Sequence, residues 1–245
     1  MVEIVNDLLA YDGIKIVQRP DMFNFSLDSL LLGYFAPVSI KTKKIIDFGT
    51  GNAPIPLYLT LRTDALIEAV EIQEDVFRLA DKSVKMNNFE NQITLYNRDL
   101  IGIHKEVGVN CYDLVTCNPP FFKHLESSNI NKTEYKTIAR HEVKLKLEDI
   151  LIEAKKVLKN KGYLAMVYRP DRLAELMGLL RQHSLEPKSL RMVYPSKGTN
   201  ANGLIIIAQK GANAGMKVLE PIFVHKGEEY TKIVREVFYL KKTMI

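Results

Sequence analysis

Four consecutive residues, Asn118-Pro119-Pro120-Phe121, place two hydrogen-bond acceptors next to an aromatic ring. Two successive prolines keep the backbone extended and donate no hydrogen bond, so the carbonyls at this point are free to accept from a ligand. The Asn118 side-chain carbonyl and the Pro119 main-chain carbonyl can accept the two hydrogens of one amino group. Phe121 adds a face on which a planar base can stack, an interaction worth about 1 to 3 kcal/mol. The tetrapeptide therefore predicts chemistry at a planar, conjugated amino group, with all four residues in the catalytic site.

The lone pair of such an amino group is delocalised, which makes the nitrogen a poor nucleophile. Two acceptors that hold both hydrogens help the nitrogen to pyramidalise and direct its lone pair at an electrophile. If the electrophile is an activated methyl donor, no metal and no strong base are needed, because the proton can leave after transfer. A base within a helix or structured loop must first be flipped out. The alternative is a tight Asx-Pro-Pro turn that closes a strand, with Phe121 simply buried.

A glycine-rich turn lies upstream, at Asp47-Phe48-Gly49-Thr50-Gly51-Asn52-Ala53-Pro54. Its glycines permit positive φ angles and close approach of a ligand to the backbone. A dinucleotide-binding fingerprint requires a third glycine three positions after Gly51, and Pro54 occupies that position. Asp47 would repel a phosphate and attract an ammonium group. S-adenosylmethionine carries an ammonium group and no phosphate, so the turn predicts this cofactor.

Two further acidic residues follow predicted strands and match other donor groups of the same cofactor. Glu71 lies 20 residues beyond Gly51 and can accept hydrogen bonds from both ribose hydroxyls. Asp99 can accept one from the exocyclic amine of adenine. Each acidic residue alone is weak support, because a carboxylate at a strand end is usually solvated, but their order and spacing together predict a cofactor site. The other expected cofactor contacts are Thr50, Asn52, Ile72, Leu100 and Asn118.

The elements that must position these residues alternate along the chain. Short apolar runs of β type are predicted at residues 44–48, 66–71, 92–96, 112–117 and 162–168. Helical periodicity is predicted at residues 53–62, 74–87, 147–159 and 171–182. Repeated strand-helix-strand units imply right-handed crossovers and a parallel sheet that is covered on both faces.

The chain changes character after residue 182. Residues 188–194, 203–209 and 217–225 are predicted strands with no helix between them, so the sheet is expected to have an antiparallel end. A final amphipathic helix is predicted over residues 228–239. We expect a single domain over residues 1–245, with an N-terminal cap segment at 1–40 and the cofactor-binding and catalytic fold at 41–245.

Length and composition agree with an ordinary globular protein of 245 residues, of which 47% are hydrophobic and 26% charged. The N-terminus lacks the basic flank and apolar core of a signal peptide, and no run approaches the roughly 20 apolar residues of a membrane span. We therefore expect a cytoplasmic protein without a membrane partner. Cys111 and Cys117 are too few for a disulfide framework or a tetrahedral zinc site, so reduced thiols and no metal are expected.

The net charge of +5 is unevenly distributed along the chain. Residues 121–161 hold ten Lys and Arg against six Asp and Glu, and residues 181–217 hold six against one, so the rest of the chain is negative. A polyanion-binding face requires clustered cations of this kind. A solvated basic surface would have the same composition, and the charge pattern alone does not distinguish the two.

The glycine-rich turn, the acidic strand ends and the Asn118-Pro119-Pro120-Phe121 tetrapeptide together resemble class I S-adenosylmethionine-dependent methyltransferases with an (Asn/Asp)-Pro-Pro-(Phe/Tyr) motif. Members of that group methylate adenine N6, guanine N2 or glutamine N5. The resemblance implies an α/β, Rossmann-like fold with a seven-stranded, mostly parallel sheet, an antiparallel C-terminal strand and helices on both faces. It indicates the type of acceptor atom and not the substrate.

Two end segments are similar to the bacterial tRNA(Val) adenine-N6 methyltransferase family in particular. Residues 23–32, which include Ser26 and Asp28, resemble the segment that caps the cofactor in that family, so both residues are expected at the cofactor. Residues 225–240 resemble the C-terminal ending of the family. The alternative explanation is that residues 23–32 are only a packed N-terminal helix, with Asp28 as its cap.

A long insertion follows the tetrapeptide, at a position where substrate loops usually lie. Its basic residues are expected to contact RNA phosphates next to the target base. The expected RNA contacts are Lys123, Lys132, Lys136, Arg140 and Lys144. His141 is a weakly supported candidate for a general base, because a lone loop histidine is usually solvated.

The resemblance implies N6-methylation of an adenine in tRNA, beside the anticodon of tRNA(Val). Guanine-N2 methylation of ribosomal RNA stays open, although such enzymes often carry an extra domain for which 245 residues leave no room. Glutamine-N5 methylation of release factors stays open too, although that family typically has a larger N-terminal domain. A scaffold that binds RNA without chemistry is a further alternative, against which the intact tetrapeptide argues. The oligomeric state is open, with a monomer as the simpler expectation.

Overall fold

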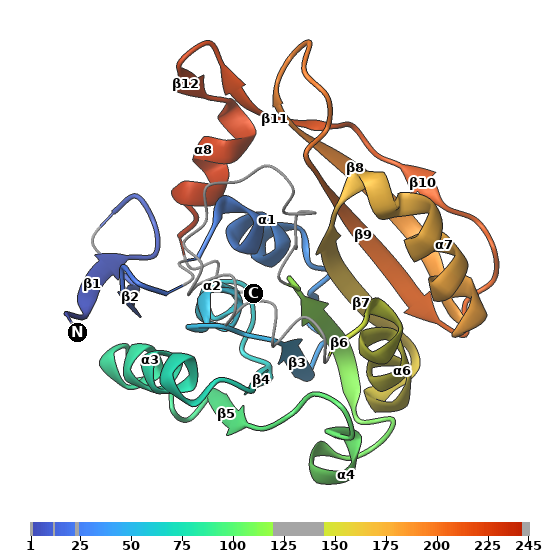
Figure 1. The fold of residues 1–245 in the computed structure, drawn as a ribbon, viewed down its shortest axis with the longest axis horizontal. Helices are drawn as coiled ribbons and strands as arrows, with labels where there is room; N and C mark the ends of the chain where they lie inside the picture. The colour runs from blue at the N-terminus through green and yellow to red at the C-terminus, as the bar shows by residue number, and fades with distance from the viewer. Residues whose placement is uncertain (1, 12, 23–24, 120–144, 242–245) are drawn as a thin grey trace.

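The structure of the chain is a computed structural model that describes residues 2–11, 13–22, 25–119 and 145–241 (Figure 1). Within these ranges the strands form a two-stranded N-terminal sheet and a ten-stranded sheet. No helix in the described ranges is long and apolar enough to cross a membrane.

Five parallel strands form the half of the large sheet that carries the candidate site. They are β3 (Lys44–Phe48), β4 (Leu66–Glu71), β5 (Ile93–Asn97), β6 (Tyr112–Cys117) and β7 (Leu158–Tyr168). Their order across the sheet is β5-β4-β3-β6-β7, so the direction of chain progression reverses between β3 and β6. Open α/β sheets bind ligands outside the carboxyl ends of the strands at such a reversal. All five predicted strands are confirmed, and only β5 and β7 differ from the predicted bounds.

The C-terminal third of the chain extends the sheet beyond β7 with β8 (Leu185–Ser196), β9 (Gly203–Lys210), β10 (Lys217–Val218), β11 (Ile222–Lys226) and β12 (Glu229–Tyr230). β9 pairs antiparallel with β7, and β8 pairs antiparallel with β9. β10 and β11 both run parallel to β8, and β12 closes the edge against β11. The α/β fold class is confirmed, and the expected count of seven strands is exceeded because β10, β11 and β12 continue the sheet.

The single strand predicted at residues 217–225 is divided near Pro221, which has no N–H to donate to a neighbouring strand. β10 pairs with β8 at Ser189, whereas β11 joins β8 further along, at Val193. Between the two strands the Glu220 carbonyl accepts a hydrogen bond of 2.6 Å from Arg191 Nη1. The break therefore shifts the chain along β8 without leaving the sheet.

Helices cover both faces of the sheet, as predicted (Figure 1). One face carries α1 (Leu27–Phe35), α2 (Pro54–Leu59), α3 (Glu74–Met86) and α8 (Lys232–Phe238), and the other carries α4 (His104–Val107), α6 (Leu147–Val157) and α7 (Leu173–Gln182). Alternate strand residues supply the two cores, because successive side chains of a strand point to opposite faces. Ile45 and Leu114 belong to the core beneath α1 and α2, while Ile46 and Val115 belong to the core beneath α6.

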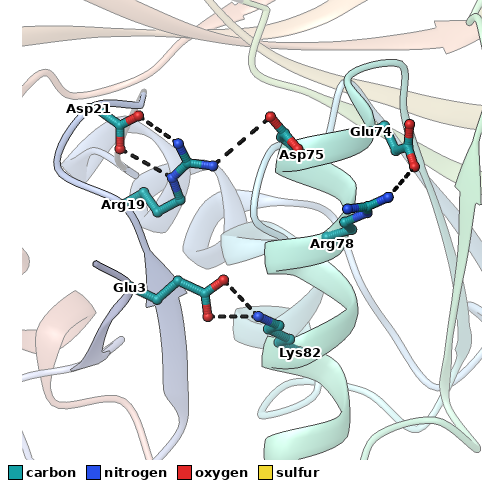
Figure 2. A network of polar contacts seen from close by, with 7 residues as sticks. All are labelled: Glu3, Arg19, Asp21, Glu74, Asp75, Arg78 and Lys82. Atoms are coloured by element: carbon teal, nitrogen blue, oxygen red, sulfur yellow. Dashed lines mark hydrogen bonds and ion pairs between the residues drawn. The ribbon is translucent and has the colours of Figure 1, made fainter. Parts of the chain in front are cut away.

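The N-terminal segment contains a hairpin that the sequence did not predict, formed by β1 (Ile4–Asp7) and β2 (Lys15–Gln18). Figure 2 shows the charged side chains that hold this hairpin and the turn after it against α3. Glu3 pairs with Lys82 at 2.6 Å, and Arg19 lies 3.9 Å from Asp75. Beneath these contacts the Val17 N–H donates to the buried Ser83 hydroxyl at 2.9 Å. The N-terminal segment, which was expected to be a cap, therefore contains a small two-stranded sheet that packs on α3, and α1 follows it.

Close packing fixes α1 against α2. A Cβ atom added at Gly33 would lie 2.8 Å from a ring carbon of Tyr58, so only glycine fits between the helices without a shift. Tyr58 cannot move easily, because it is fully buried and its hydroxyl donates to the Val237 carbonyl at 2.8 Å. Arg62 Nη1 donates to the carbonyls of Gly33 and Ala36 at the end of α1, at 2.6 and 2.9 Å. The helix that leads into the candidate site is therefore rigidly placed.

We predict that Gly33→Ala lowers the free energy of unfolding by about 1 to 3 kcal/mol, because the added methyl group overpacks the interface with Tyr58. Gly178→Ala is the matched control, since Gly178 lies within α7 and no atom approaches its would-be Cβ within 4 Å. That substitution should raise the free energy of unfolding by about 0.5 to 1 kcal/mol. Denaturant unfolding of both variants checks the prediction, and equal effects of the two would contradict it.

Candidate functional site

Polar residues end three adjacent strands, β4, β3 and β6, on the face that carries α1 and α2. Along β3, Ile45 belongs to that core and Asp47 follows two residues later on the same face. Along β6, Leu114 belongs to it and Asn118 follows four residues later. Glu71 is the last residue of β4. Alternate residues of a strand point to the same face of the sheet. The alternation that buries the apolar residues therefore also places Asp47, Glu71 and Asn118 on one face, at the carboxyl ends of the strands.

The turn after β3 has the backbone geometry expected of a ligand-binding loop. Gly49 and Gly51 have φ angles of 65° and 61°, which favour glycine, and Ala53 adopts the same left-handed region at 69°. No atom lies within 4 Å of a would-be Cβ at either glycine, so the space beside both is open. The Thr50 N–H donates to the Val70 carbonyl at 2.9 Å, which ties the turn to β4. The turn therefore leaves open space beside its backbone at Gly49 and Gly51.

Asp47 is fully buried and only one of its carboxylate oxygens is paired. The Thr116 hydroxyl, from the neighbouring strand, donates to Asp47 Oδ1 at 2.6 Å. Burial raises the pKa of Asp47 to about 7, against the opposing effects of the Thr116 and Thr50 hydroxyls. The nearby Glu71 carboxylate raises this pKa further, since a second negative charge disfavours ionisation. A cation at this place would favour the ionised carboxylate.

Glu71 connects the end of β4 to the glycine-rich turn. Its Oε2 atom accepts the Gly51 N–H at 3.0 Å and its Oε1 atom accepts the Gln73 N–H at 2.8 Å. Burial raises the pKa of Glu71, and these two backbone donors oppose that effect. Asn97, at the end of β5, donates to the Glu71 carbonyl at 2.8 Å. Because each carboxylate oxygen has a further lone pair, Glu71 can still accept from a ligand.

Asn118 follows β6 and is held through its amide nitrogen. Asn118 Nδ2 donates to Ser29 Oγ on α1 at 3.0 Å, whereas Asn118 Oδ1 is buried and has no partner within the described residues. Pro119 is buried beside it. The Asn118 carbonyl oxygen is therefore left able to accept a hydrogen bond.

Three buried acceptor atoms at this edge lack hydrogen-bond partners in the described part of the chain: Asp47 Oδ2, Thr50 Oγ1 and Asn118 Oδ1. A buried polar atom left unpaired costs about 1 to 3 kcal/mol, so such atoms mark places where a ligand supplies the missing partner. A ligand with an ammonium group, hydroxyls and no phosphate matches this donor requirement. S-adenosylmethionine has these groups, and the open backbone at Gly49 and Gly51 leaves space for it.

Four other residues expected at the cofactor, Asn52, Leu100, Ile72 and Asp99, range from buried to exposed. The Asn52 side chain donates to the Val17 carbonyl at 3.0 Å, so its amide nitrogen holds the N-terminal hairpin against the turn. Leu100 packs in the core beneath α4 and α6, and Ile72 is 42% exposed. Asp99 is exposed, and its Oδ1 atom accepts the Ile101 N–H at 2.9 Å.

Ser26 and Asp28 stand at the start of α1, on the same helix as Ser29. Ser26 is the N-cap residue, and its hydroxyl makes no capping hydrogen bond. Asp28 is in the first turn, where burial raises the pKa of its carboxyl and the positive charge of Arg169 lowers it. The N-cap of α1 is therefore Ser26 and not Asp28, and the Ser26 hydroxyl is not used to cap the helix.

Several expected site residues lie outside the described residues. They are Pro120, Phe121, His141 and the expected RNA contacts Lys123, Lys132, Lys136, Arg140 and Lys144. In the described ranges, no group of three or more His, Cys, Asp or Glu side chains could hold a metal ion.

Two residues of the site were missed by the sequence analysis. Thr116 pairs in register with Asp47 across β6 and β3, and the parallel strand pattern could have indicated it. Ser29 is 89 residues from Asn118 in the chain, and no local pattern predicts that the two side chains meet. Thr116 pairs with one oxygen of Asp47 and Ser29 with the amide nitrogen of Asn118, so Asp47 Oδ2 and Asn118 Oδ1 are left unpaired within the described residues.

The strand order, its reversal at β3 and β6, and the open turn with acidic strand ends are the features of a class I methyltransferase fold. Solved structures agree with this class. A structure described as a predicted O-methyltransferase from Agrobacterium tumefaciens superposes with a TM-score of 0.69 at 19% identity, over 86% of this chain and 94% of that one. Pyrococcus horikoshii TYW2 in complex with MeSAdo superposes with a TM-score of 0.58 at 12% identity, over 86% and 72% of the two chains.

A family model described as methyltransferase small domain matches residues 15–183, and the chain belongs to this family. A relative from Parabacteroides distasonis, named tRNA1(Val) (adenine(37)-N6)-methyltransferase, is 30% identical over 87% of this chain and 90% of its own length. A relative of the same name from Flavobacterium psychrophilum is 24% identical over 96% of this chain and all of its own length. The resemblance noted from the sequence is thereby confirmed.

We predict that Asp47→Asn removes a pH dependence from the stability of the cofactor-free protein. Because the pKa of Asp47 is raised from 3.8 to about 7 in the folded state, its stabilising contribution is complete below pH 4 and is lost as the pH rises through 7. The free energy of unfolding of the wild type, relative to that of the variant, should fall by up to about 1.4 kcal/mol per pH unit in that window. Denaturant unfolding between pH 4 and pH 8 measures this difference.

Glu90→Gln removes an exposed carboxylate and serves as the control, which should follow the wild type across the same pH range. A constant difference between the wild type and Asp47→Asn from pH 4 to pH 8 would show that Asp47 is not the buried acid described here.

Proposed function

We propose that the protein transfers a methyl group from S-adenosylmethionine to N6 of an adenine in tRNA, beside the anticodon of tRNA(Val). The observation that carries the proposal is the pair of buried, unpaired acceptors Asp47 Oδ2 and Asn118 Oδ1, at the ends of the adjacent strands β3 and β6. One acceptor suits the ammonium group of a cofactor and the other suits the amino group of a substrate. Two such sites on neighbouring strands are what group transfer between two bound molecules requires.

The residues of the turn and of β4 would hold the cofactor. Asp47 would bind its ammonium group, the backbone at Gly49 and Gly51 would lie against it, and Glu71 would accept from its ribose hydroxyls. Thr50 and Asp99 are proposed as further contacts. The bound cofactor supplies a methyl group on a sulfonium, so that a new N–C bond forms as the S–C bond breaks and its electron pair returns to sulfur.

Asn118 and Pro119 would hold the acceptor amine by its two hydrogens. An aromatic amino nitrogen that donates both hydrogens to fixed acceptors is turned so that its lone pair points away from them, towards the methyl group. After transfer the nitrogen carries an extra proton, which can leave to water. Phe121, outside the described residues, is proposed to stack on the base, and the basic residues of the same insertion are proposed to contact phosphates.

The choice of adenine N6 in tRNA is supported by the relatives and not by the geometry. Adenine N6, guanine N2 and glutamine N5 each present two hydrogens to the same two acceptors. Relatives from Parabacteroides distasonis, Aeromonas salmonicida and Flavobacterium psychrophilum all carry the name tRNA1(Val) (adenine(37)-N6)-methyltransferase. A tRNA substrate would also suit a cytoplasmic protein, which is our proposal for its location.

We predict that the protein transfers labelled methyl from S-adenosylmethionine to the tRNA fraction of cells that lack the enzyme, and that nucleoside analysis recovers the label as N6-methyladenosine. Ribosomal RNA, DNA and protein fractions are assayed in parallel. Label in N2-methylguanosine of ribosomal RNA, or in protein, would keep the amine chemistry and overturn the substrate. Absence of label from every fraction, despite cofactor binding, would favour a scaffold without chemistry.

We predict that substitutions at Asn118 and Glu71 separate catalysis from cofactor binding. Asn118→Ala should lower kcat by about 100-fold and change the affinity for S-adenosylmethionine far less, because its main effect is to remove an acceptor for the amine. Glu71→Ala should weaken cofactor binding by at least about 10-fold, because both ribose contacts and the tie to Gly51 are lost. Calorimetric titration and steady-state kinetics measure the two effects.

Glu68→Gln is the control for the second variant, since Glu68 lies on β4 away from its carboxyl end and pairs with Lys44 at 2.8 Å. It should leave the cofactor affinity unchanged. Full activity of Asn118→Ala would show that the amine contact is assigned to the wrong side chain.

A further inference from the structure

We propose that Thr116 is a positioning residue for the cofactor: its hydroxyl holds one oxygen of the Asp47 carboxylate, so that the other oxygen faces the ammonium group of S-adenosylmethionine. This inference rests on the role that the proposed function assigns to Asp47. It makes β6 the strand that serves both bound molecules, since Thr116 would act on the cofactor side and Asn118, two residues later, on the amine.

The hydrogen bond between Thr116 and Asp47 has a defined direction when Asp47 is ionised. A carboxylate has no hydrogen to donate, so the Thr116 hydroxyl must supply the hydrogen of the 2.6 Å contact with Asp47 Oδ1. Asp47 Oδ2 is buried and unpaired within the described residues. The protein therefore satisfies one oxygen of the ionised carboxylate and leaves the other for a cationic ligand.

Thr116 can orient Asp47 because strand pairing holds it on both sides. It pairs in register with Asp47 on β3 and with Ala165 on β7, and it is fully buried. The Asp47 carboxylate can rotate about the bond between Cβ and Cγ, but a hydroxyl donor at a fixed position favours the rotation that brings Oδ1 to it. The register of two parallel strands thus sets the direction in which Asp47 Oδ2 points.

The same hydrogen bond favours the ionised form of Asp47, because a donor stabilises the negative charge. Burial raises the pKa of Asp47 to about 7, and the Thr116 hydroxyl acts in the opposite direction. An ammonium group binds an ionised carboxylate far more tightly than a neutral acid. Cofactor affinity should therefore rise with pH up to about 7 and then level off, and loss of the Thr116 hydroxyl should move this rise to higher pH.

Three other groups, from the turn, β4 and β6, interact with Asp47. The Thr50 hydroxyl lowers the pKa of Asp47, and the negative charge of Glu71 raises it. Burial and the charge of Asp47 both raise the pKa of the Cys117 thiol. Replacement of Thr116 by valine leaves all three groups in place, so a change in the pH profile of binding can be assigned to the lost hydroxyl.

Binding of S-adenosylhomocysteine between pH 5.5 and pH 8.5 tests the proposal, because this ligand carries the ammonium group and needs no RNA. Thr116→Val keeps the shape of the side chain and removes the donor. It should weaken binding by about 10-fold at pH 6 and by less than about 3-fold at pH 8.5, as the midpoint of the profile rises by about one pH unit. Thr116→Ser, which keeps a hydroxyl, should restore most of the wild-type profile.

Thr60→Val is the matched control. Thr60 is also buried, and its hydroxyl donates to the Leu57 carbonyl at 2.8 Å, at the end of α2. Its loss should leave the pH profile of binding unchanged. Equal weakening of binding by Thr116→Val at every pH would overturn the proposal, because a merely structural role of Thr116 does not depend on the ionisation of Asp47. An unchanged profile in Thr116→Val would overturn it too.

Proton release on binding separates this inference from the proposed function. Calorimetric titration at pH 7.5, in buffers of different ionisation enthalpy, counts the protons that leave as S-adenosylhomocysteine binds. Thr116→Val should release about half a proton more than the wild type. If Asp47→Asn bound the ligand as the wild type does, the proposed role of Asp47 would be wrong, and this inference with it. If Asp47→Asn weakened binding but Thr116→Val released no additional proton, only the role of Thr116 would be wrong.

Discussion

Asp47 lies fully buried at the carboxyl end of β3, with one oxygen bound by Thr116 and the other unpaired within the described chain. A carboxylate removed from water in this way favours its neutral form, which is why the pKa of Asp47 rises to about 7. A bound cation would stabilise the negative charge of the ionised Asp47 carboxylate. The site is therefore organised for a positively charged ligand before that ligand arrives, and the free protein carries the cost of the unpaired acceptor.

The surrounding structure keeps this arrangement in place. Parallel pairing sets Asp47 beside Thr116, the Glu71 carboxylate holds the turn through the Gly51 N–H, and the packing of Gly33 on Tyr58 fixes α1. The two hydrogen bonds use only part of the accepting capacity of each carboxylate, and the packing contact uses none. Acceptor atoms that face the site therefore stay available to a ligand. The fold thus positions acceptors without satisfying them, which is the condition for binding two donor-bearing molecules at one edge of the sheet.

Much of this arrangement could be predicted from the sequence because it depends on local patterns. The turn from Asp47 to Gly51 and the end of β6 at Asn118 follow strands whose apolar residues have a clear period. Contacts between distant segments could not be predicted: Ser29 reaches Asn118 across 89 residues, and Asn52 turns to the Val17 carbonyl of a hairpin with no strong strand pattern. The break near Pro221 could have been predicted, since Glu220-Pro221 interrupts the apolar run and a proline has no N–H to donate to a neighbouring strand.

The decisive experiment is a crystal structure with S-adenosylhomocysteine bound. We expect the ammonium group of this ligand to pair with Asp47 Oδ2 and its ribose hydroxyls to bind Glu71. We expect Asn118 Oδ1 to remain unpaired and directed towards the position of the missing methyl group. A ligand bound elsewhere, or one that pairs with Asn118 Oδ1 and leaves Asp47 Oδ2 unpaired, would show that these acceptors do not have the roles assigned to them.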